Sequence, residues 1–154
     1  MVWKPRVVVA AVVEQDGRYL LVEEEVHGRM VLNQPAGHLE YGESLLDAVR
    51  RETLEETGYR FEPEALLGMI LGHSDDPDRV YLRFAFCGRI LEKVADQPLD
   101  DDITAVHWLT PQQIRAHERL TPRNPLVLHT IELYQQGVRL PLDSLYNLNN
   151  PHQA

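Results

Sequence analysis

Three glutamates with helical spacing are the residues in this chain best suited to chemistry. Glu52, Glu55 and Glu56 stand at positions i, i+3 and i+4, so on a helix they share one face. Each such pair of like charges repels by about 0.2–0.5 kcal/mol, and the negative end of the helix dipole disfavours anions further. A divalent cation on this face would reverse both effects. Because hard divalent cations prefer oxygen ligands, these residues predict a site for a divalent cation.

The surrounding residues predict the helix that presents the glutamates. Ser44 is a suitable N-cap with Asp47 in the capping-box position, and Gly58 is a typical C′ glycine. These signals predict a helix over residues 45–57, after a glycine-containing loop. Apolar residues precede Glu52 on the same side of this helix. We therefore expect its first half to pack on the core and its second half to open into a cleft.

The remaining chain predicts a mixed β-sheet. Helices are expected at Thr110-Pro111 and over residues 123–136. There is no regular β–α–β alternation, so the expected fold class is α+β or α/β, with helices on the faces of the sheet. The length favours a single domain over residues 1–154, whose tail from about residue 147 is a candidate for disorder. Strands are predicted over residues 5–13, 18–25, 30–32, 65–73, 78–91 and 103–109.

Composition and charge exclude several classes of partner. The net charge is −9, and even with all 7 histidines protonated the 24 acidic residues exceed the 22 basic ones (15 Lys and Arg plus 7 His). This argues against a nucleic-acid polymer or an anionic membrane as the main partner. The single cysteine, Cys87, excludes an intrachain disulfide, and no apolar run approaches the ~18 residues of a membrane span. We expect a cytoplasmic, monomeric protein that binds a small phosphorylated substrate with the help of cations.

Residues 37–59 resemble the Nudix hydrolase box. That box consists of Gly, five residues, Glu, seven residues, Arg-Glu, an apolar residue, any residue, Glu-Glu, any residue, Gly and an apolar residue. Chance agreement of all seven fixed positions is below about one in a million per chain for ordinary residue usage. Thr53 and Tyr59 depart from the apolar positions, which concerns packing rather than chemistry. The fixed positions are Gly37, Glu43, Arg51, Glu52, Glu55, Glu56 and Gly58.

The likeness extends beyond the box. The preceding segment NQPAGHLE, the LRF of residues 82–84 and Trp108 are similar to the NudJ group of small Nudix phosphatases. The resemblance implies a Nudix-type α/β/α sandwich with a mixed sheet and a loop–helix–loop catalytic motif. It also implies Mg²⁺ as cofactor, with Mn²⁺ as a substitute, and attack by water on phosphorus. The implied substrates are nucleoside tri- and diphosphates or hydroxymethylpyrimidine pyrophosphate, a thiamine precursor.

The resemblance also suggests roles for individual residues. Glu55 is the first candidate for the general base and Glu52 the second, with Asp102 and the acidic loop 75–78 as alternatives. Arg51 joins the catalytic set because it can pair with Glu55 or with Glu43 and orient the acidic face. The metal ligands implied are the Gly37 carbonyl and the carboxylates of Glu52, Glu55, Glu56 and Asp102.

Substrate-binding residues are harder to assign from the sequence. Arg6 and Arg83 are candidates to hold phosphates as bidentate donors, although arginine on a strand is as often a surface residue. Tyr81 is a candidate to stack on a pyrimidine, but core packing is the competing interpretation. Gln34, in the loop before the box, completes the set.

Two other functions remain open at this point. A sugar-nucleotide or dinucleotide pyrophosphatase would yield two phosphorylated fragments, whereas a NudJ-like enzyme would release inorganic phosphate from a diphosphate ester. A Nudix fold can also be a non-catalytic nucleotide-binding or regulatory module. The complete set of Glu52, Glu55 and Glu56 argues against such a module, which would have no need to keep these carboxylates.

Overall fold

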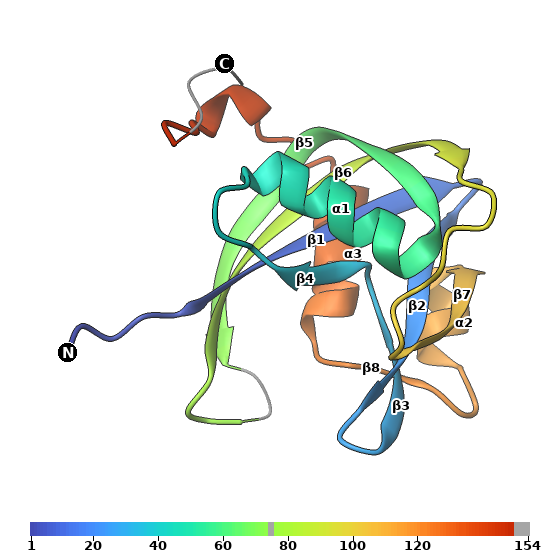
Figure 1. The fold of residues 1–154 in the computed structure, drawn as a ribbon. Coiled ribbons are helices and arrows are strands. Elements are labelled where there is room, and N and C mark those ends of the chain that lie inside the picture. Colours follow the sequence, from blue (N-terminus) through green and yellow to red (C-terminus); the bar gives the residue numbers. More distant parts are fainter. Residues whose placement is uncertain (74–75, 150–154) are drawn as a thin grey trace.

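Strands and helices form a layered structure in which α1 and α3 lie on opposite sides of a sheet (Figure 1). The computed structural model describes residues 1–73 and 76–149. The helices are α1 (Leu45–Thr57), α2 (Pro111–Arg115) and α3 (Leu126–Gln135), followed by the 3₁₀ turn η1 (Leu142–Ser144). The strands are β1 (Arg6–Gln15), β2 (Arg18–Val26), β3 (Arg29–Asn33), β4 (Ala36–His38), β5 (Tyr59–His73), β6 (Val80–Lys93), β7 (Ile103–Leu109) and β8 (Thr121–Pro122).

The sheet has two parts that separate from a shared hairpin. In one part β5, β6, β1 and β4 lie side by side, with β1 parallel to β6 and antiparallel to β4. In the other, β2 is antiparallel to β7 and β3, and β3 is parallel to β8. β1 and β2 pair only beside their turn, at Glu14–Tyr19 and Gln15–Arg18. Their far ends diverge, and the cavity described below lies there.

Side-chain alternation along β1 and β6 produces two core layers. One layer joins Val12 and Cys87 to residues of α3, and the other joins Val9 and Phe86 to residues of α1. Successive side chains of a strand point to opposite faces, so each of these helices covers one face. The mixed sheet and its two helical layers confirm the predicted α/β/α sandwich.

Helix α1 begins and ends where the sequence predicts. Ser44 Oγ accepts a hydrogen bond from the Asp47 N–H at 3.0 Å, and the Gly58 N–H donates to the Leu54 carbonyl at 2.8 Å. Gly58 has a φ of 76°, a conformation that glycine adopts without steric cost. Thr53 is fully buried and its hydroxyl donates to a backbone carbonyl one turn earlier. This bond accommodates a polar side chain at a packed position.

The start of β5 differs from the sequence-based prediction. The strand begins at Tyr59, directly after α1, and not at residue 65. The prediction was wrong because Pro63 between two glutamates is typical of a loop. Pro63 lies opposite Gly88 beside a register shift, and a Cβ on Gly88 would lie 2.0 Å from the Glu62 carbonyl oxygen. The absence of that Cβ lets the strands approach closely where proline interrupts the ladder.

Other boundaries agree more closely, with two short strands added. β4 lies in a segment predicted as a loop, and β8 was not predicted. The helix predicted at Thr110-Pro111 is confirmed, and Thr110 caps it through a capping box with Gln113, whereas α3 begins at Leu126 and not at residue 123. Residues 150–154 of the predicted disordered tail lie outside the described residues. In the described part of the chain, no helix combines the length and apolar character needed to cross a membrane.

Candidate active site

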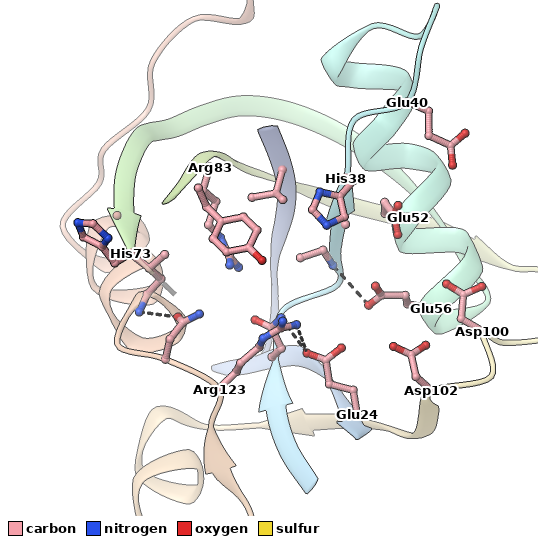
Figure 2. A pocket seen from close by; sticks show the side chains of 18 residues that line it. Glu24, His38, Glu40, Glu52, Glu56, His73, Arg83, Asp100, Asp102 and Arg123 are labelled. Atoms are coloured by element: carbon pink, nitrogen blue, oxygen red, sulfur yellow. Dashed lines mark hydrogen bonds and ion pairs between the residues drawn. The ribbon is translucent and has the colours of Figure 1, made fainter. Parts of the chain in front are cut away.

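A cavity of about 430 Å³ opens where β1 and β2 diverge. Figure 2 shows carboxylates from α1 and the loop before β7 gathered on one side, with Arg83 and His73 on the other. The cavity therefore has an acidic wall and a wall with cationic and neutral donors. Its charged and polar lining residues are Glu24, Asn33, His38, Glu40, Glu52, Glu56, His73, Tyr81, Arg83, Asp100, Asp102, Arg123 and Asn124.

Close contact between β4 and α1 positions Glu52. A Cβ built on Gly37 would lie 2.1 Å from Glu52 Cδ, so any other residue at position 37 would displace this carboxylate. β4 is in turn held by β1, with Gly37 opposite Val9. The sheet and the missing Cβ together place Glu52 in the cavity wall.

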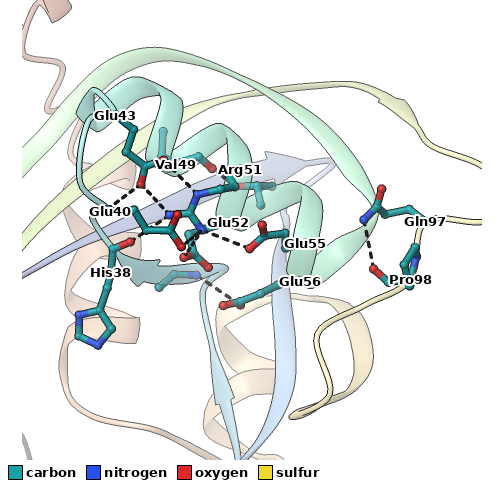
Figure 3. Close-up of polar contacts among 12 residues, drawn as sticks. His38, Glu40, Glu43, Val49, Arg51, Glu52, Glu55, Glu56, Gln97 and Pro98 are labelled. Carbon is teal, nitrogen blue, oxygen red and sulfur yellow. Dashed lines mark hydrogen bonds and ion pairs between the residues drawn. The ribbon is translucent and has the colours of Figure 1, made fainter.

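Arg51 connects the loop before α1 to the acidic face of the helix (Figure 3). Its Nε and Nη2 donate to the two carboxylate oxygens of Glu43, at 3.0 and 2.7 Å. Its Nη1 donates to Glu52 at 2.7 Å and to Glu55 at 3.2 Å, and Nη2 also donates to the His38 carbonyl at 3.0 Å. Hydrogen bonds to Glu43 and Glu52 hold the pKa of Arg51 above its usual range. Both pairings suggested by the sequence are present.

Burial dominates the electrostatics of Glu56 and Glu52. Glu56 is 6% exposed, and its Oε2 accepts a long hydrogen bond from the Ala36 N–H at 3.4 Å. Desolvation, with the charges of Glu24 and Glu52, raises the pKa of Glu56 to about 10. Burial also raises the pKa of Glu52, against the opposing effect of Arg51. A bound cation would stabilise both ionised carboxylates, so the pair is chemically suited to a divalent metal ion.

A group of oxygen atoms at the second half of α1 extends the acidic wall. One carboxylate oxygen each of Glu52, Glu55 and Asp100 lie within 4.8 Å of one another. The Asp100 N–H donates to the Glu55 carbonyl at 3.0 Å, which ties the loop before β7 to the helix. Burial, followed by the charge of Asp102, raises the pKa of Asp100. An all-carboxylate donor set suits a hard divalent ion.

An ion pair between a buried carboxylate and a partly exposed arginine, at the base of the cavity, was missed by sequence reasoning. Glu24 is 4% exposed and accepts hydrogen bonds from Arg123 Nη1 at 2.9 Å and from Asn33 Nδ2 at 3.1 Å. Glu24 lies in a run of three glutamates, a pattern typical of an exposed strand, and Arg123 is 99 positions away. Only the parallel pairing of β8 with β3 brings that arginine to the site. Other charged or polar lining residues without a role predicted from the sequence are His38, Glu40, His73, Asp100 and Asn124.

The predicted site residues are mostly, but not all, brought together. Glu55 and Arg51 flank the cavity on α1, and Gln34 lies behind the wall, bonded to Arg83. Arg6 is exposed at the start of β1 and does not line the cavity, and Asp75 lies outside the described residues. These positions leave the catalytic, metal-binding and substrate-binding roles as predictions. The predicted residues that line the cavity are Gly37, Glu52, Glu56, Tyr81, Arg83 and Asp102.

Comparisons of the sequence and of the structure with known proteins all identify Nudix proteins as relatives. A model of the NUDIX domain matches residues 3–131. The chain is 39% identical over 150 residues to Phosphatase NudJ of Escherichia coli K12, covering 97% of this chain and 95% of that protein. It is 47% identical to a solved NUDIX hydrolase from Nitrosomonas europaea, with a TM-score of 0.90 and coverage of 96% and 99%. The NUDIX domain of Shewanella oneidensis NrtR, solved with ADP ribose, shares the fold at 18% identity, with a TM-score of 0.71 and coverage of 88% and 90%.

Proposed function

The chain belongs to the Nudix hydrolases, which cleave phosphoric anhydride bonds, and on this premise we propose that it is a Mg²⁺-dependent phosphatase or pyrophosphohydrolase. Its proposed substrates are nucleoside tri- and diphosphates or hydroxymethylpyrimidine pyrophosphate. The proposal rests on the pair of buried carboxylates, Glu52 and Glu56. Burial raises the pKa of both, so a bound cation would stabilise their ionised forms. The 39% identity to Phosphatase NudJ over nearly the whole chain supports the substrate class.

The proposed mechanism assigns separate tasks to the residues of α1. Glu52 and Glu56, with the Gly37 carbonyl and Asp102, would hold Mg²⁺, which neutralises phosphate charge and acidifies water when bound. Glu55 accepts the proton of the attacking water. Water oxygen then bonds to phosphorus while the anhydride P–O bond breaks, and the leaving phosphate takes the bond's electron pair.

Arg51 would orient the proposed base. Its Nη1 donates to Glu55 Oε2 at 3.2 Å and to Glu52 at 2.7 Å, while Glu43 holds the other edge of the guanidinium. Glu55 is 39% exposed at its side chain, so a proton that it accepts can pass to solvent. The carboxylate that moves protons is thus separated from the buried carboxylate, Glu56, that is suited to metal.

The decisive experiment is a substrate panel with free phosphate and pyrophosphate measured separately. It should include nucleoside di- and triphosphates, hydroxymethylpyrimidine pyrophosphate and sugar nucleotides, each with Mg²⁺, Mn²⁺ or EDTA. Metal-dependent release of phosphate from a diphosphate is expected. Two phosphorylated fragments from sugar nucleotides alone would identify a pyrophosphatase of the other class, and no turnover across the panel would favour a binding module.

Variants of the glutamates test the individual roles. Glu56→Gln should abolish most metal-dependent turnover, whereas Glu118→Gln at an exposed position is a matched control without effect. Glu55→Gln should lower kcat more than it changes KM, since a base acts in the transition state. A raised KM with unchanged kcat would make Glu55 a binding residue instead.

The oligomeric state, location and domain content of the protein form a separate part of the proposal. We infer a monomeric, cytoplasmic enzyme with a single domain over residues 1–154. Light scattering coupled to size-exclusion chromatography tests whether the protein is a monomer, and a mass near the 17.7 kDa of one chain is expected. A mass of twice that value would refute it.

A further inference from the structure

Arg83 is a buried cation without an ion-pair partner in the described part of the chain. It is 5% exposed and lines the cavity, yet its one hydrogen bond within residues 1–73 and 76–149 goes to an uncharged amide, Gln34. Its Nε is buried and makes no hydrogen bond. A buried charge without a partner is costly, so such a group is retained in a cavity wall when a ligand supplies the missing charge.

Strand alternation explains how this cation comes to be buried. Arg83, Ala85 and Cys87 are alternate residues of β6 and point to the same face. Ala85 and Cys87 belong to the core layer covered by α3. Arg83 is thus the next residue on the face of β6 that carries Ala85 and Cys87, and it lies where this face reaches the cavity. Its burial is imposed by the sheet, because residue 83 lies between β1 and β5 in the ladder, opposite Val8 and Ile70.

Gln34 fixes the direction of the guanidinium. Its side chain is 1% exposed, and its Nε2 donates to the Val127 carbonyl of α3 at 2.7 Å. The amide nitrogen must face that carbonyl, so the amide oxygen faces the other way and accepts from Arg83 Nη2 at 3.2 Å. Helix α3 therefore holds the arginine in one orientation through a single amide.

The other arginine of the cavity is in a different electrostatic state. Arg123 donates to Glu24 at 2.9 Å, so its charge is compensated within the protein. Burial and the charge of Arg123 lower the pKa of Arg83 to about 10, against the opposing charges of Glu24 and Glu56, and the group remains a cation at neutral pH. Among the described residues Arg83 is therefore a buried cation with no carboxylate in direct contact, and it lies across the cavity from the carboxylates of α1 (Figure 2).

We propose that Arg83, oriented by Gln34, binds an anionic phosphate oxygen of the substrate on the wall opposite the acidic residues. This inference rests on the proposed function and deepens it, because it names a second anchoring point for the phosphate chain. A substrate would be held between the acidic wall and the Arg83 guanidinium. Arg83 is then a specificity-determining residue that touches substrate, and Gln34 is a positioning residue.

Equilibrium binding of a methylene-bridged nucleoside diphosphate in the presence of Mg²⁺ tests the proposal without turnover. Arg83→Met should weaken binding of this analogue by about 10- to 100-fold, the effect of losing a charge-assisted hydrogen bond. Arg83→Lys keeps the charge but loses the planar guanidinium, so its affinity for the analogue should lie between those of the wild type and Arg83→Met. Arg115→Met, at an exposed position of α2, is the matched control and should bind like the wild type.

A second variant separates the role of Gln34 from that of Arg83. Gln34→Glu keeps the side-chain volume and places a carboxylate against the guanidinium, which would neutralise it, and it also removes the donor to the Val127 carbonyl. Analogue binding should fall to the level of Arg83→Met although the arginine is still present. Unchanged affinity in Arg83→Met, or in Gln34→Glu, would overturn the inference.

Thermal denaturation without ligand gives an independent readout. If Arg83 served only the fold, Arg83→Met would lower the melting temperature. We expect the melting temperature to stay equal or to rise, because an unpartnered buried charge is removed, and a loss above about 5 °C would overturn the proposal. Turnover by the wild type on the substrate panel tests the proposed function separately, so failure of either idea can be recognised by itself.

Discussion

Replacement of Glu56 by glutamine should stabilise the metal-free protein while weakening its response to Mg²⁺. Glu56 is 6% exposed and shares the cavity wall with Glu24 and Glu52. Glutamine has nearly the same shape and can still accept the hydrogen bond that the Ala36 N–H makes with Oε2. The substitution therefore removes a titrating group without removing packed atoms.

The magnitude follows from the pKa of Glu56. Desolvation raises this pKa from 4.5 to about 10 in the folded protein. Between these values the folded state holds a proton that the unfolded state has released, so stability falls as pH rises, by about 1.4 kcal/mol per pH unit. At pH 7 the difference of 2.5 units from 4.5 corresponds to about 3 kcal/mol. Glutamine carries no such penalty, so the variant should be more stable by this amount, or by roughly 6–12 °C in melting temperature.

Urea denaturation at several pH values, in EDTA and in MgCl₂, measures the effect. In EDTA the free-energy difference between Glu56→Gln and wild type should be near zero at pH 4 and should grow to about 3 kcal/mol at pH 7. Mg²⁺ should stabilise the wild type more than the variant, because only the carboxylate can bind the ion as an anion. Glu55→Gln, at a half-exposed position of the same helix, should change stability in EDTA by less than about 1 kcal/mol.

One result would refute the reasoning. If Glu56→Gln were no more stable than wild type at pH 7 in EDTA, or if the difference did not change with pH, burial of Glu56 would not raise its pKa as the structure indicates. The metal site would then require a different explanation from the cost of two buried carboxylates.

Three further perturbations follow from the geometry of the acidic wall. Gly37→Ala should lower metal-dependent activity by at least about 100-fold, because its Cβ would lie 2.1 Å from a carboxylate carbon of α1. Gly68→Ala is the control and should retain activity, because its Cβ would meet the nearest atom at 4.0 Å and Gly68 does not line the cavity. Asp100→Asn should raise the Mg²⁺ concentration needed for half-maximal activity several-fold, and Asp101→Asn, which does not line the cavity, should not. Arg51→Met should lower the free energy of unfolding in urea by about 2 kcal/mol, because the partly exposed guanidinium that pairs with Glu43, Glu52 and Glu55 is lost. Unchanged stability would show that these ion pairs do not stabilise the fold.

Much of the acidic wall was predictable because its geometry is local. The i, i+3 and i+4 spacing places Glu52, Glu55 and Glu56 on one face whenever residues 45–57 are helical. The caps at Ser44 and Gly58 make that helix predictable as well, and both are present in the structure. Thr53 shows the limit of this reasoning, since its departure from an apolar residue is resolved by a local hydrogen bond.

The rest of the cavity depends on contacts between distant segments. Glu24 lies in an acidic run without a sequence signal, and it becomes a buried site residue only because β2 diverges from β1 at that end. Arg123 reaches it through the pairing of β8 with β3, and Asp100 reaches Glu55 through a bond between a loop and the end of α1. These approaches depend on strand order and twist, which no local pattern encodes.

The sequence by itself determined the reaction class, since seven residues at fixed spacing and one capped helix suffice to present the carboxylates. The tertiary structure decided what faces those carboxylates. It placed Gly37 where a Cβ would collide with Glu52, and it buried Arg83 opposite the acidic wall. The physical reason is one of range. Helix geometry relates residues three or four positions apart, whereas the residues that face them across the cavity are set by which strands pair in the sheet.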